Sequence, residues 1–510
     1  RCFFSHFHFN KLQYYSFFVA NNIFDMISQG KEPIEKEISL IVAELLETVF
    51  KKTNPNPADM WNEHKFIRAK LDRIAELQSS LSDTDIGIAA KRGPGALEEF
   101  MAWCDRKGIV RSVDVAEDPR MGYQLVATED HNEGDIVVTV PRKAIFCLDQ
   151  VKKLPGLRKL FLHDPMLAKM DNVGLALGVC ALQLKDDSSW APYINILPST
   201  FDTPLFFSLQ QFEDLRPSPL FEEALNHYRS IARQFTYYLS IIDDGISFDK
   251  RKKEDKQGKQ PPLLYDGPFN IGNFTFELYR WAVSVVCTRI NHLPSDYEKI
   301  DEKSKVPKQI PCLMPLLDMA NHSFNEESLF HPGYSDMKDL AVLPVNTAVK
   351  KGEPVTIVYG RRTTAEFFLM NAFSPIVNPY NKYKLRIGLT KSDRFINDRI
   401  AQMSKLGYNN LNTVYSFNLF ISKDGEMPFD ESLVRFSRVF MSNPPIDEVV
   451  ESDDSLKKGL QFLETRLTLL LRGYTKSKLE GESNTNILLR QEKEILEHVV
   501  TYIQGWRERL

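Results

Sequence analysis

Two segments of this chain share one pattern of strands and turns, although more than 200 residues separate their first residues. The first segment, GYQLVATEDHNEGDIVVTVP, covers residues 122–141, and the second, LAVLPVNTAVKKGEPVTIVYG, covers residues 340–360. Each holds two apolar runs rich in β-branched residues around a turn-forming cluster, which is typical of a β-hairpin. We therefore predict two hairpins that belong to one sheet system and are split by a long insertion.

Helical periodicity dominates the rest of the chain. Apolar residues at helical spacing predict helices within 38–49 and 67–74, and three more in the insertion, over 173–184, 221–242 and 279–286. Near the C-terminus, a leucine stripe predicts one helix, and a second apolar run predicts another. The stripe consists of Leu456, Leu460, Leu463, Leu467, Leu470 and Leu471, and the second run of Ile495, Leu496 and Val499.

The composition excludes several classes of partner. The chain has 510 residues, 43% of them hydrophobic, and a net charge of −4, so it can bury a large core in more than one domain. A net charge so close to zero predicts neither a nucleic acid nor a membrane surface as partner. No apolar run in the sequence is long enough to span a bilayer. The six scattered cysteines include no C-x-x-C pair, which indicates free thiols in a reducing compartment and no metal site. We expect a cytoplasmic protein, with a nuclear pool left open.

Three stretches carry no function in our interpretation. Residues 1–25 are rich in aromatic residues without a clear period, and we interpret them as a non-native or disordered leader before a start at Met26. The charged stretches 249–262 and 295–309 are expected to be exposed loops. The basic run within the first of them is interpreted as solvated rather than as a nuclear signal.

The most unusual polar cluster lies in LLDMANHSF, residues 316–324, where Asp318, Asn321 and His322 interrupt an apolar run. An unpaired buried polar group costs roughly 1–3 kcal/mol, so either the fold or a ligand must satisfy these side chains. Taken alone, His322 would be an ordinary hydrogen-bonded core histidine. Phosphate-loop, serine-hydrolase and zinc-protease motifs are absent from the sequence.

Three segments are more informative together than each is alone. They are YRWAVSVVCTRINH (279–292), PLLDMANHS (315–323) and VTIVYGRRTTAEFFLMNAF (355–373). Together they resemble the SET-domain methyltransferases of the plant Rubisco type. The resemblance implies an α+β fold with a β-sheet core closed by a pseudoknot, a helical insertion and an all-α C-terminal substrate-binding domain. It extends to 190–207 in the insertion and 388–395 in the C-terminal region.

The resemblance also implies domain boundaries. N-terminal helices would occupy 26–90. The SET domain would occupy 91–382, with its insertion at about 148–280, and the C-terminal domain would occupy 383–510. The protein is expected to be a monomer.

Site residues are carried over from the family position by position. Tyr359 and Asn291 would act at the methyl-transfer centre. The S-adenosylmethionine site would consist of Arg92, Gly122, Tyr123, Arg289, Asp318, Asn321, His322, Asn371 and Phe373. The substrate peptide would contact Asn172, Thr288, Leu317 and Arg362. The chain departs from the family pattern at Gln124, where the family has glycine, at Leu317, where an actin-modifying enzyme has tryptophan, and at Asn371, where it has serine.

The resemblance implies a protein substrate. The runs TRIN (288–291) and YGRRTTAEF (359–367) are similar to those of the branch that methylates a histidine of actin. The amide of Asn291 can bond one nitrogen of an imidazole and direct the other toward the methyl group. Two alternatives remain open: a protein-lysine methyltransferase of the same fold, and a non-catalytic SET-fold interaction protein.

Overall fold

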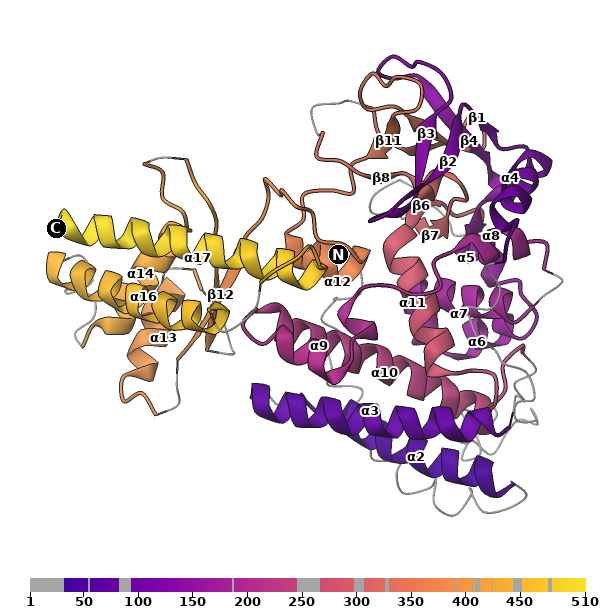
Figure 1. Cartoon of the computed structure of the whole chain (residues 1–510). Coiled ribbons are helices and arrows are strands. Elements are labelled where there is room, and N and C mark those ends of the chain that lie inside the picture. Colours follow the sequence, from indigo (N-terminus) through magenta and orange to yellow (C-terminus); the bar gives the residue numbers. More distant parts are fainter. Residues whose placement is uncertain are drawn as a thin grey trace. The chain divides into compact units, whose positions relative to one another are not determined.

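The computed structural model divides the chain into two units (Figure 1), one within Arg1–Phe201 and Leu225–Gly360 and the other within Asp202–Ala224 and Arg361–Leu510. The structure describes residues 32–53, 56–81, 93–185, 188–244, 267–297, 307–325, 330–389, 392–405, 407–408, 413–423, 425–443, 452–475 and 479–510. The predicted leader at 1–25 and Arg92 lie outside these ranges, as does most of both charged loops.

Helices are the main secondary structure of the first unit. They are α2 (Pro33–Phe50), α3 (Pro57–Ser79), α4 (Ala96–Lys107), α5 (Leu148–Val151), α6 (Leu157–His163), α7 (Asp171–Gln183), α8 (Ala191–Ile196), most of α10 (Leu220–Asp244) and α11 (Phe276–Arg289), with the short 3-10 helices η3 (Arg142–Ala144), η4 (Leu167–Lys169) and η7 (Leu317–Met319). The helices predicted at 38–49, 67–74, 173–184, 221–242 and 279–286 are confirmed as α2, α3, α7, α10 and α11.

The N-terminal helices show why the periodicity was informative. Pro33 and Pro57 each occupy the first turn of a helix, where proline loses no hydrogen bond, and the side chain of Asn56 accepts from the N–H of Ala58 to cap α3. Every apolar position of the α2 stripe is buried, and α2 packs against α3. Burial of one face, rather than intrinsic propensity, accounts for most of the stability of such helices.

Among its described residues, the first unit also has three sheets. The strand order is β1–β4–β10–β9 in the first sheet, β2–β3–β11–β8 in the second and β5–β7–β6 in the third. The strands are β1 (Val110–Arg111), β2 (Val113–Asp118), β3 (Gly122–Ala127), β4 (Ile136–Pro141), β5 (Phe146–Cys147), β6 (Asn291–Pro294), β7 (Gln309–Leu313), β8 (Asn321–His322), β9 (Gly333–Ser335), β10 (Leu340–Pro344) and β11 (Pro354–Ile357).

The two repeated segments associate, but the prediction that each is a hairpin is wrong. Strand β3 of the first segment pairs with β11 of the second, and β4 pairs with β10, so the four strands are shared between two sheets. The connections 128–135 and 345–353 are too long to fix tight hairpins. They bond to each other instead: His131 pairs with Val349, and the N–H of Gly134 donates to the carbonyl of Val345 (3.0 Å).

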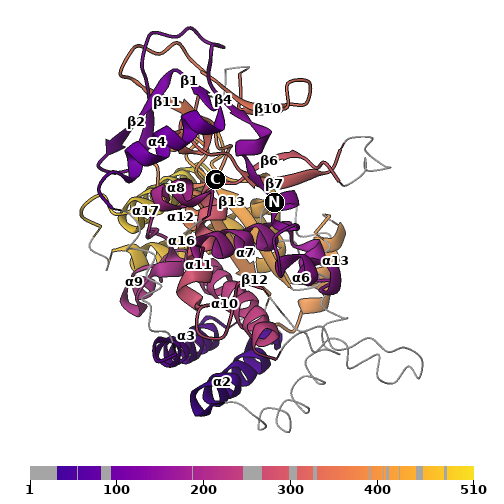
Figure 2. The same ribbon diagram turned by 90° about the vertical axis from the view of Figure 1, so that its right-hand side faces the viewer.

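The third sheet carries one of the predicted catalytic residues. Strands β6 and β7 lie side by side as an antiparallel pair (Figure 2), and β5 lines the other edge of β7. In this register Cys147, Cys312 and Asn291 form one row across the three strands. Asn291 is the first residue of β6, two residues after the end of α11.

The second unit is mainly helical and has its own core. It contains η5 (Pro204–Phe206), α9 (Leu209–Asp214), the first residues of α10, α12 (Thr364–Asn371), α13 (Ile396–Lys405), α14 (Glu431–Met441), α16 (Asp453–Tyr474) and α17 (Asn484–Glu508). Leu460, Leu463 and Leu467 of the predicted stripe are fully buried in this core, as is Leu496 on α17.

The expectation of an all-α C-terminal region needs one correction. A two-stranded antiparallel sheet, β12 (Tyr383–Gly388) with β13 (Val414–Leu419), lies among the helices. Tyr383, Leu385 and Ile387 are buried, whereas Lys384 and Arg386 are exposed, so this segment alternates with the period of a strand. The α+β class itself is confirmed.

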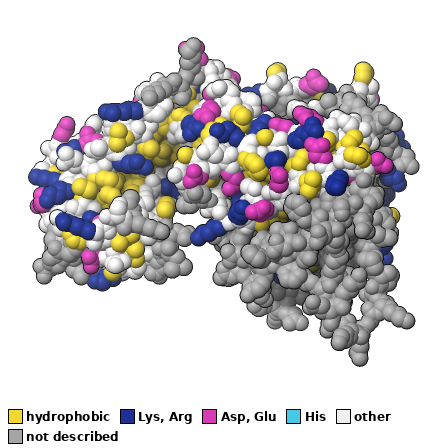
Figure 3. Space-filling model, turned by 90° about the horizontal axis from the view of Figure 1, so that it is seen from below, with side chains coloured by type: hydrophobic (Ala, Val, Ile, Leu, Met, Phe, Trp, Pro, Cys, Tyr) yellow, Lys and Arg dark blue, Asp and Glu magenta, His cyan; other side chains and the backbone are white. Residues whose placement is uncertain are grey.

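Charged side chains of both signs lie among apolar ones on the face of the molecule that Figure 3 presents. Within the described ranges, the helices are too short or too polar to cross a bilayer.

Candidate active site

Two segments far apart in the sequence meet at the short strand β8. Asn321 and His322 pair in parallel with Thr356 and Ile357 of β11, and the N–H of Ser323 donates to the carbonyl of Ile357 (2.9 Å). The end of β11 therefore lies beside the Asn-His pair, and the next residues of the chain lead to Tyr359. This is the crossing of segments that the family resemblance implied.

Tyr359 is attached to this crossing at two points. Its backbone N–H donates to Nδ1 of His322 (3.1 Å), and its hydroxyl donates to the carbonyl of Ala320 (2.9 Å). Because Nδ1 accepts a hydrogen bond, it carries no proton. The neutral imidazole then has its proton on Nε2. The two rings lie 5.3 Å apart between centroids. The Tyr359 side chain is thus held in a fixed direction at the strand end.

A buried ion pair lies next to this crossing. Nη1 of Arg289, at the end of α11, donates to both the carbonyl and Oδ1 of Asp318, each at 3.0 Å. The other carboxylate oxygen of Asp318 accepts from the hydroxyl of Tyr193 on α8. The Asp318 side chain has no exposed surface, and that of Arg289 retains 12%. Asp318 and Tyr193 together fix the guanidinium group.

Burial and charge act against each other within this ion pair. Burial raises the pKa of the Asp318 carboxyl, and the Arg289 charge and the Tyr193 hydroxyl offset part of that effect. Burial also raises the pKa of the Tyr193 hydroxyl far above its ordinary value, with a further contribution from the Asp318 charge. Tyr193 therefore remains a neutral hydrogen-bond donor.

One donor of Arg289 is left over. Its Nε is buried and has no hydrogen-bond acceptor within the described part of the chain. A buried N–H without a partner costs free energy, so a bound ligand that brings an acceptor would stabilise it. Burial lowers the pKa of Arg289, but the Asp318 charge, with smaller contributions from Tyr193 and Tyr359, outweighs burial, so the pKa is raised overall.

Gly122 and Tyr123, two of the predicted cofactor residues, lie at the start of β3, next to this crossing. Gly122 begins β3 with a positive φ of 76°, a conformation that favours glycine. Nδ2 of Asn321 donates to the carbonyl of Tyr123 (3.5 Å). The structure therefore brings Tyr123, Asn321, His322 and Tyr359 together. The roles of the first three in cofactor binding stay predictions.

Asn291, Thr288 and Asn172 lie on or next to the elements that pack around the β6–β7 pair. The Nδ2 group of Asn291 donates to the carbonyl of Arg289 (3.2 Å), and its Oδ1 accepts no hydrogen bond from the described residues. Lys308 pairs with Asp171 (3.2 Å), which joins the β6–β7 pair to the first turn of α7, where Asn172 lies. The hydroxyl of Thr288 donates to the carbonyl of Ser284 (2.9 Å), within its own helix.

Two assignments need correction. Leu317 is fully buried in η7, so its side chain has no surface to offer a peptide. Asp318 is also buried and fully engaged by Arg289 and Tyr193, so its carboxylate positions Arg289 instead of contacting the cofactor. Tyr193 was missed because it belongs to the helical insertion, and neither spacing nor periodicity connects it to Asp318.

Three other predicted residues belong to the second unit. Nη1 of Arg362 donates to Oδ1 of Asn371 (2.5 Å), and the ring of Phe373 lies 5.0 Å from that of Phe367, between centroids. Their roles in substrate and cofactor binding stay predictions. So does that of Arg92, which lies outside the described residues.

The comparison with solved structures identifies this arrangement. The structure of Rubisco LSMT bound to AdoMet superimposes with a TM-score of 0.58 at 18% identity and covers 81% of this chain and 92% of that one. The SET domain of LSMT bound to lysine and AdoHcy gives the same score and coverage. The chain has the SET-domain fold. The Asn321–His322 strand beside the end of β11 is thus part of a SET core.

Sequence comparison finds relatives that match most of this chain. The actin-histidine N-methyltransferase of Danio rerio is 29% identical over 498 residues, which is 91% of this chain and 77% of the relative. The human enzyme of that name is 28% identical over 497 residues, with the same coverage. No protein-family model matches the chain.

Proposed function

We propose that this protein is an S-adenosylmethionine-dependent protein-histidine N-methyltransferase that acts on actin. The observation that carries the proposal is Asn291, which lies at the start of β6 with an amide oxygen that accepts no bond from the described residues. Similarity to actin-histidine N-methyltransferases over 91% of the chain supports it.

The residues beside β8 suit the cofactor. Arg289 has a buried Nε–H that lacks an acceptor in the described chain, and the carboxylate of S-adenosylmethionine is an acceptor of the right chemistry. Asn321, His322 and the backbone at Tyr123 would hold the remainder of the molecule. When bound, the cofactor supplies a methyl group already activated on a sulfonium, so the protein mainly aligns the nucleophile and excludes water. No group of three metal-ligating side chains occurs among the described residues.

The substrate nucleophile needs a free lone pair, and this requirement separates histidine from lysine. Lysine has a pKa of about 10.4, so its deprotonation costs roughly 4–5 kcal/mol at pH 7, whereas histidine at about 6.5 is already mostly neutral. A histidine enzyme therefore needs orientation more than a strong base. Oδ1 of Asn291 can accept the N–H of one ring nitrogen, which leaves the lone pair of the other for the methyl group.

Protein-lysine methylation is the second candidate. It is favoured by the fold similarity to an enzyme whose solved structure contains lysine. The two candidates differ in what Asn291 does: it orients an imidazole in the first, and in the second it lines a channel for an aliphatic stem.

Substitution of Asn291 separates the candidates. Asn291→Ala should lower histidine methylation about tenfold to a hundredfold, since one orienting hydrogen bond contributes about 1–3 kcal/mol, while cofactor affinity stays nearly unchanged. Asn291→Phe should go further and shift preference toward a lysine at the target position. The measurement is competition between histidine and lysine versions of an actin peptide, with the products analysed by mass spectrometry.

Calorimetry with S-adenosylmethionine and a thermal melt provide the controls for these variants. Both must match the wild type for the loss to be assigned to substrate orientation. A wild-type protein that already prefers the lysine peptide, or an Asn291→Phe variant with an unchanged product ratio, would favour the lysine enzyme.

A further inference from the structure

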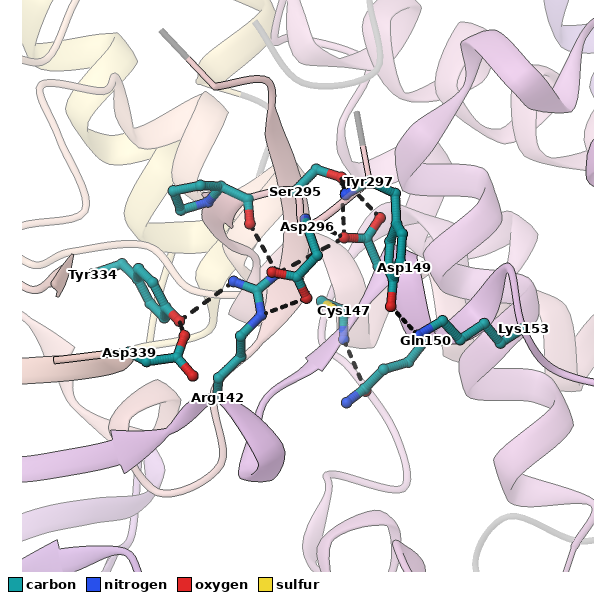
Figure 4. A network of polar contacts seen from close by, with 11 residues as sticks. Arg142, Cys147, Asp149, Gln150, Lys153, Ser295, Asp296, Tyr297, Tyr334 and Asp339 are labelled. Atoms are coloured by element: carbon teal, nitrogen blue, oxygen red, sulfur yellow. Dashed lines mark hydrogen bonds and ion pairs between the residues drawn. The ribbon is translucent and has the colours of Figure 1, made fainter. Parts of the chain in front are cut away.

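A polar network with a buried centre lies at the opposite end of β6 from Asn291 (Figure 4). Its centre consists of Arg142 in η3 and Asp149 in α5, which flank the short strand β5 in the sequence. Asp149 is only 3% exposed, and the Arg142 side chain 14%. The two groups lie 3.8 Å apart, and neither belongs to the site around β8.

Both residues bind the backbone that follows β6. Arg142 donates from Nη2 to the carbonyl of Pro294 and from Nε to the carboxylate of Asp296, each at 2.9 Å. Asp149 accepts from the hydroxyl of Ser295 (3.0 Å) and from the N–H of Asp296 (2.9 Å). The end of β6 and the two residues after it, 294–296, are thus held from two sides by charge-assisted hydrogen bonds.

A peripheral branch of the network orients Arg142 itself. Nη1 of Arg142 donates to the hydroxyl of Tyr334 (3.3 Å), which in turn donates to Asp339 (2.5 Å). The guanidinium also lies over the Tyr334 ring, 5.6 Å from its centroid. With its donors directed to three different acceptors, the guanidinium has little freedom to move.

The geometry connects this network to Asn291. Asn291 and Pro294 are the two ends of β6, about 10 Å apart at 3.3 Å per residue. The strand is fixed laterally by β7, because Asn291 lies opposite Cys312 and Cys312 lies opposite Cys147 of β5. Arg142 and Asp149 lie on either side of β5 in the sequence. Their hydrogen bonds therefore join the end of β6 to the strand that shares a row with Asn291.

We propose that Arg142 and Asp149 are positioning residues that aim the Asn291 amide at the substrate side chain by fixing the far end of β6. The inference rests on the proposed function and deepens it, because it explains how a short strand holds one amide in a productive direction. It assigns no direct contact with substrate or cofactor to either residue.

Two conservative variants test the inference. Arg142→Lys keeps the charge but cannot reach three acceptors, and Asp149→Asn keeps the shape but directs an amide donor toward the N–H of Asp296 or the hydroxyl of Ser295. Each should lower kcat for methyl transfer to the target peptide about tenfold to a hundredfold, since small misplacements are costly in catalysis. The Kd for S-adenosylmethionine should change less than about threefold, because the Arg289 and Asn321 side chains make no contact with the network.

A double-mutant cycle separates positioning from loss of stability. In an Asn291→Ala background, Arg142→Lys should change kcat by less than about twofold, because the amide through which it acts is gone. Arg229→Lys is a matched control: the Arg229 side chain is 10% exposed and donates to the carbonyls of Thr48 and Lys51, around the end of α2. It should leave kcat unchanged.

The outcomes distinguish the inference from the function on which it rests. Multiplicative losses in the double variant, or a wild-type kcat in both single variants, overturn the positioning role alone. A wild-type protein that transfers no methyl group to either the histidine or the lysine peptide overturns the proposed function, and the positioning role with it.

Discussion

Asp318→Ala is expected to be the most destabilising single substitution in the site, lowering the free energy of unfolding by about 3–5 kcal/mol. The reason is the Arg289 guanidinium, which keeps its charge at any accessible pH and has Asp318 as its ion-pair partner. Removal of the carboxylate leaves that charge buried and also leaves the Tyr193 hydroxyl without its acceptor. Chemical denaturation of the purified protein measures the loss.

A compensated variant shows whether this cluster serves stability or binding. Arg289→Met, Asp318→Leu and Tyr193→Phe together replace all three polar groups with apolar ones of similar volume, a change that is often neutral or stabilising for buried ion pairs. We expect this variant to fold with nearly the wild-type free energy of unfolding and to lose cofactor binding by calorimetry. Wild-type affinity in the triple variant would show that Arg289 is purely structural.

Tyr359→Phe is expected to lower kcat for methyl transfer about a hundredfold or more, with little change in stability. The hydroxyl is attached to the carbonyl of Ala320, and it is the only polar group of the side chain at the crossing of β8 and β11. Its loss frees the ring and removes a preorganised dipole from the site, and such losses typically cost two to three orders of magnitude. Single-turnover kinetics with saturating cofactor measures the effect on chemistry.

Tyr237→Phe is the matched control for this prediction. Tyr237 lies on α10, and its hydroxyl donates to Asp164 (3.2 Å). It also makes an aromatic contact with Phe50, at the end of α2. The control should keep the wild-type kcat. A Tyr359→Phe enzyme as active as this control would remove Tyr359 from the catalytic machinery.

Sequence patterns predicted the helices well and the strand pairing poorly. The apolar stripe of α2 or α16 defines a buried face within one segment, so its periodicity is visible locally. Strand partners are not local. The runs at 122–127 and 136–141 look like one hairpin, yet each pairs with a strand more than 200 residues away, because the connection between them is long enough to let them enter different sheets.

The same distinction applies to the site. Motif residues such as Asn321, His322 and Tyr359 could be found from their resemblance to a family, and the structure brings them together. Leu317 and Asp318 were misassigned because burial decides their roles, and the sequence does not show which side of η7 faces the core. Arg142 and Asp149 gave no signal at all, because their partners at 294–296 lie about 150 residues away.

Mass spectrometry of actin incubated with the protein and S-adenosylmethionine labelled in its methyl group tests the central claim most directly. The account predicts that the label appears on a histidine of actin and that the Asn291→Ala variant transfers much less of it at equal cofactor occupancy. Label found on lysine alone would contradict the histidine assignment, and unlabelled actin from a protein that binds the cofactor would contradict actin as the substrate.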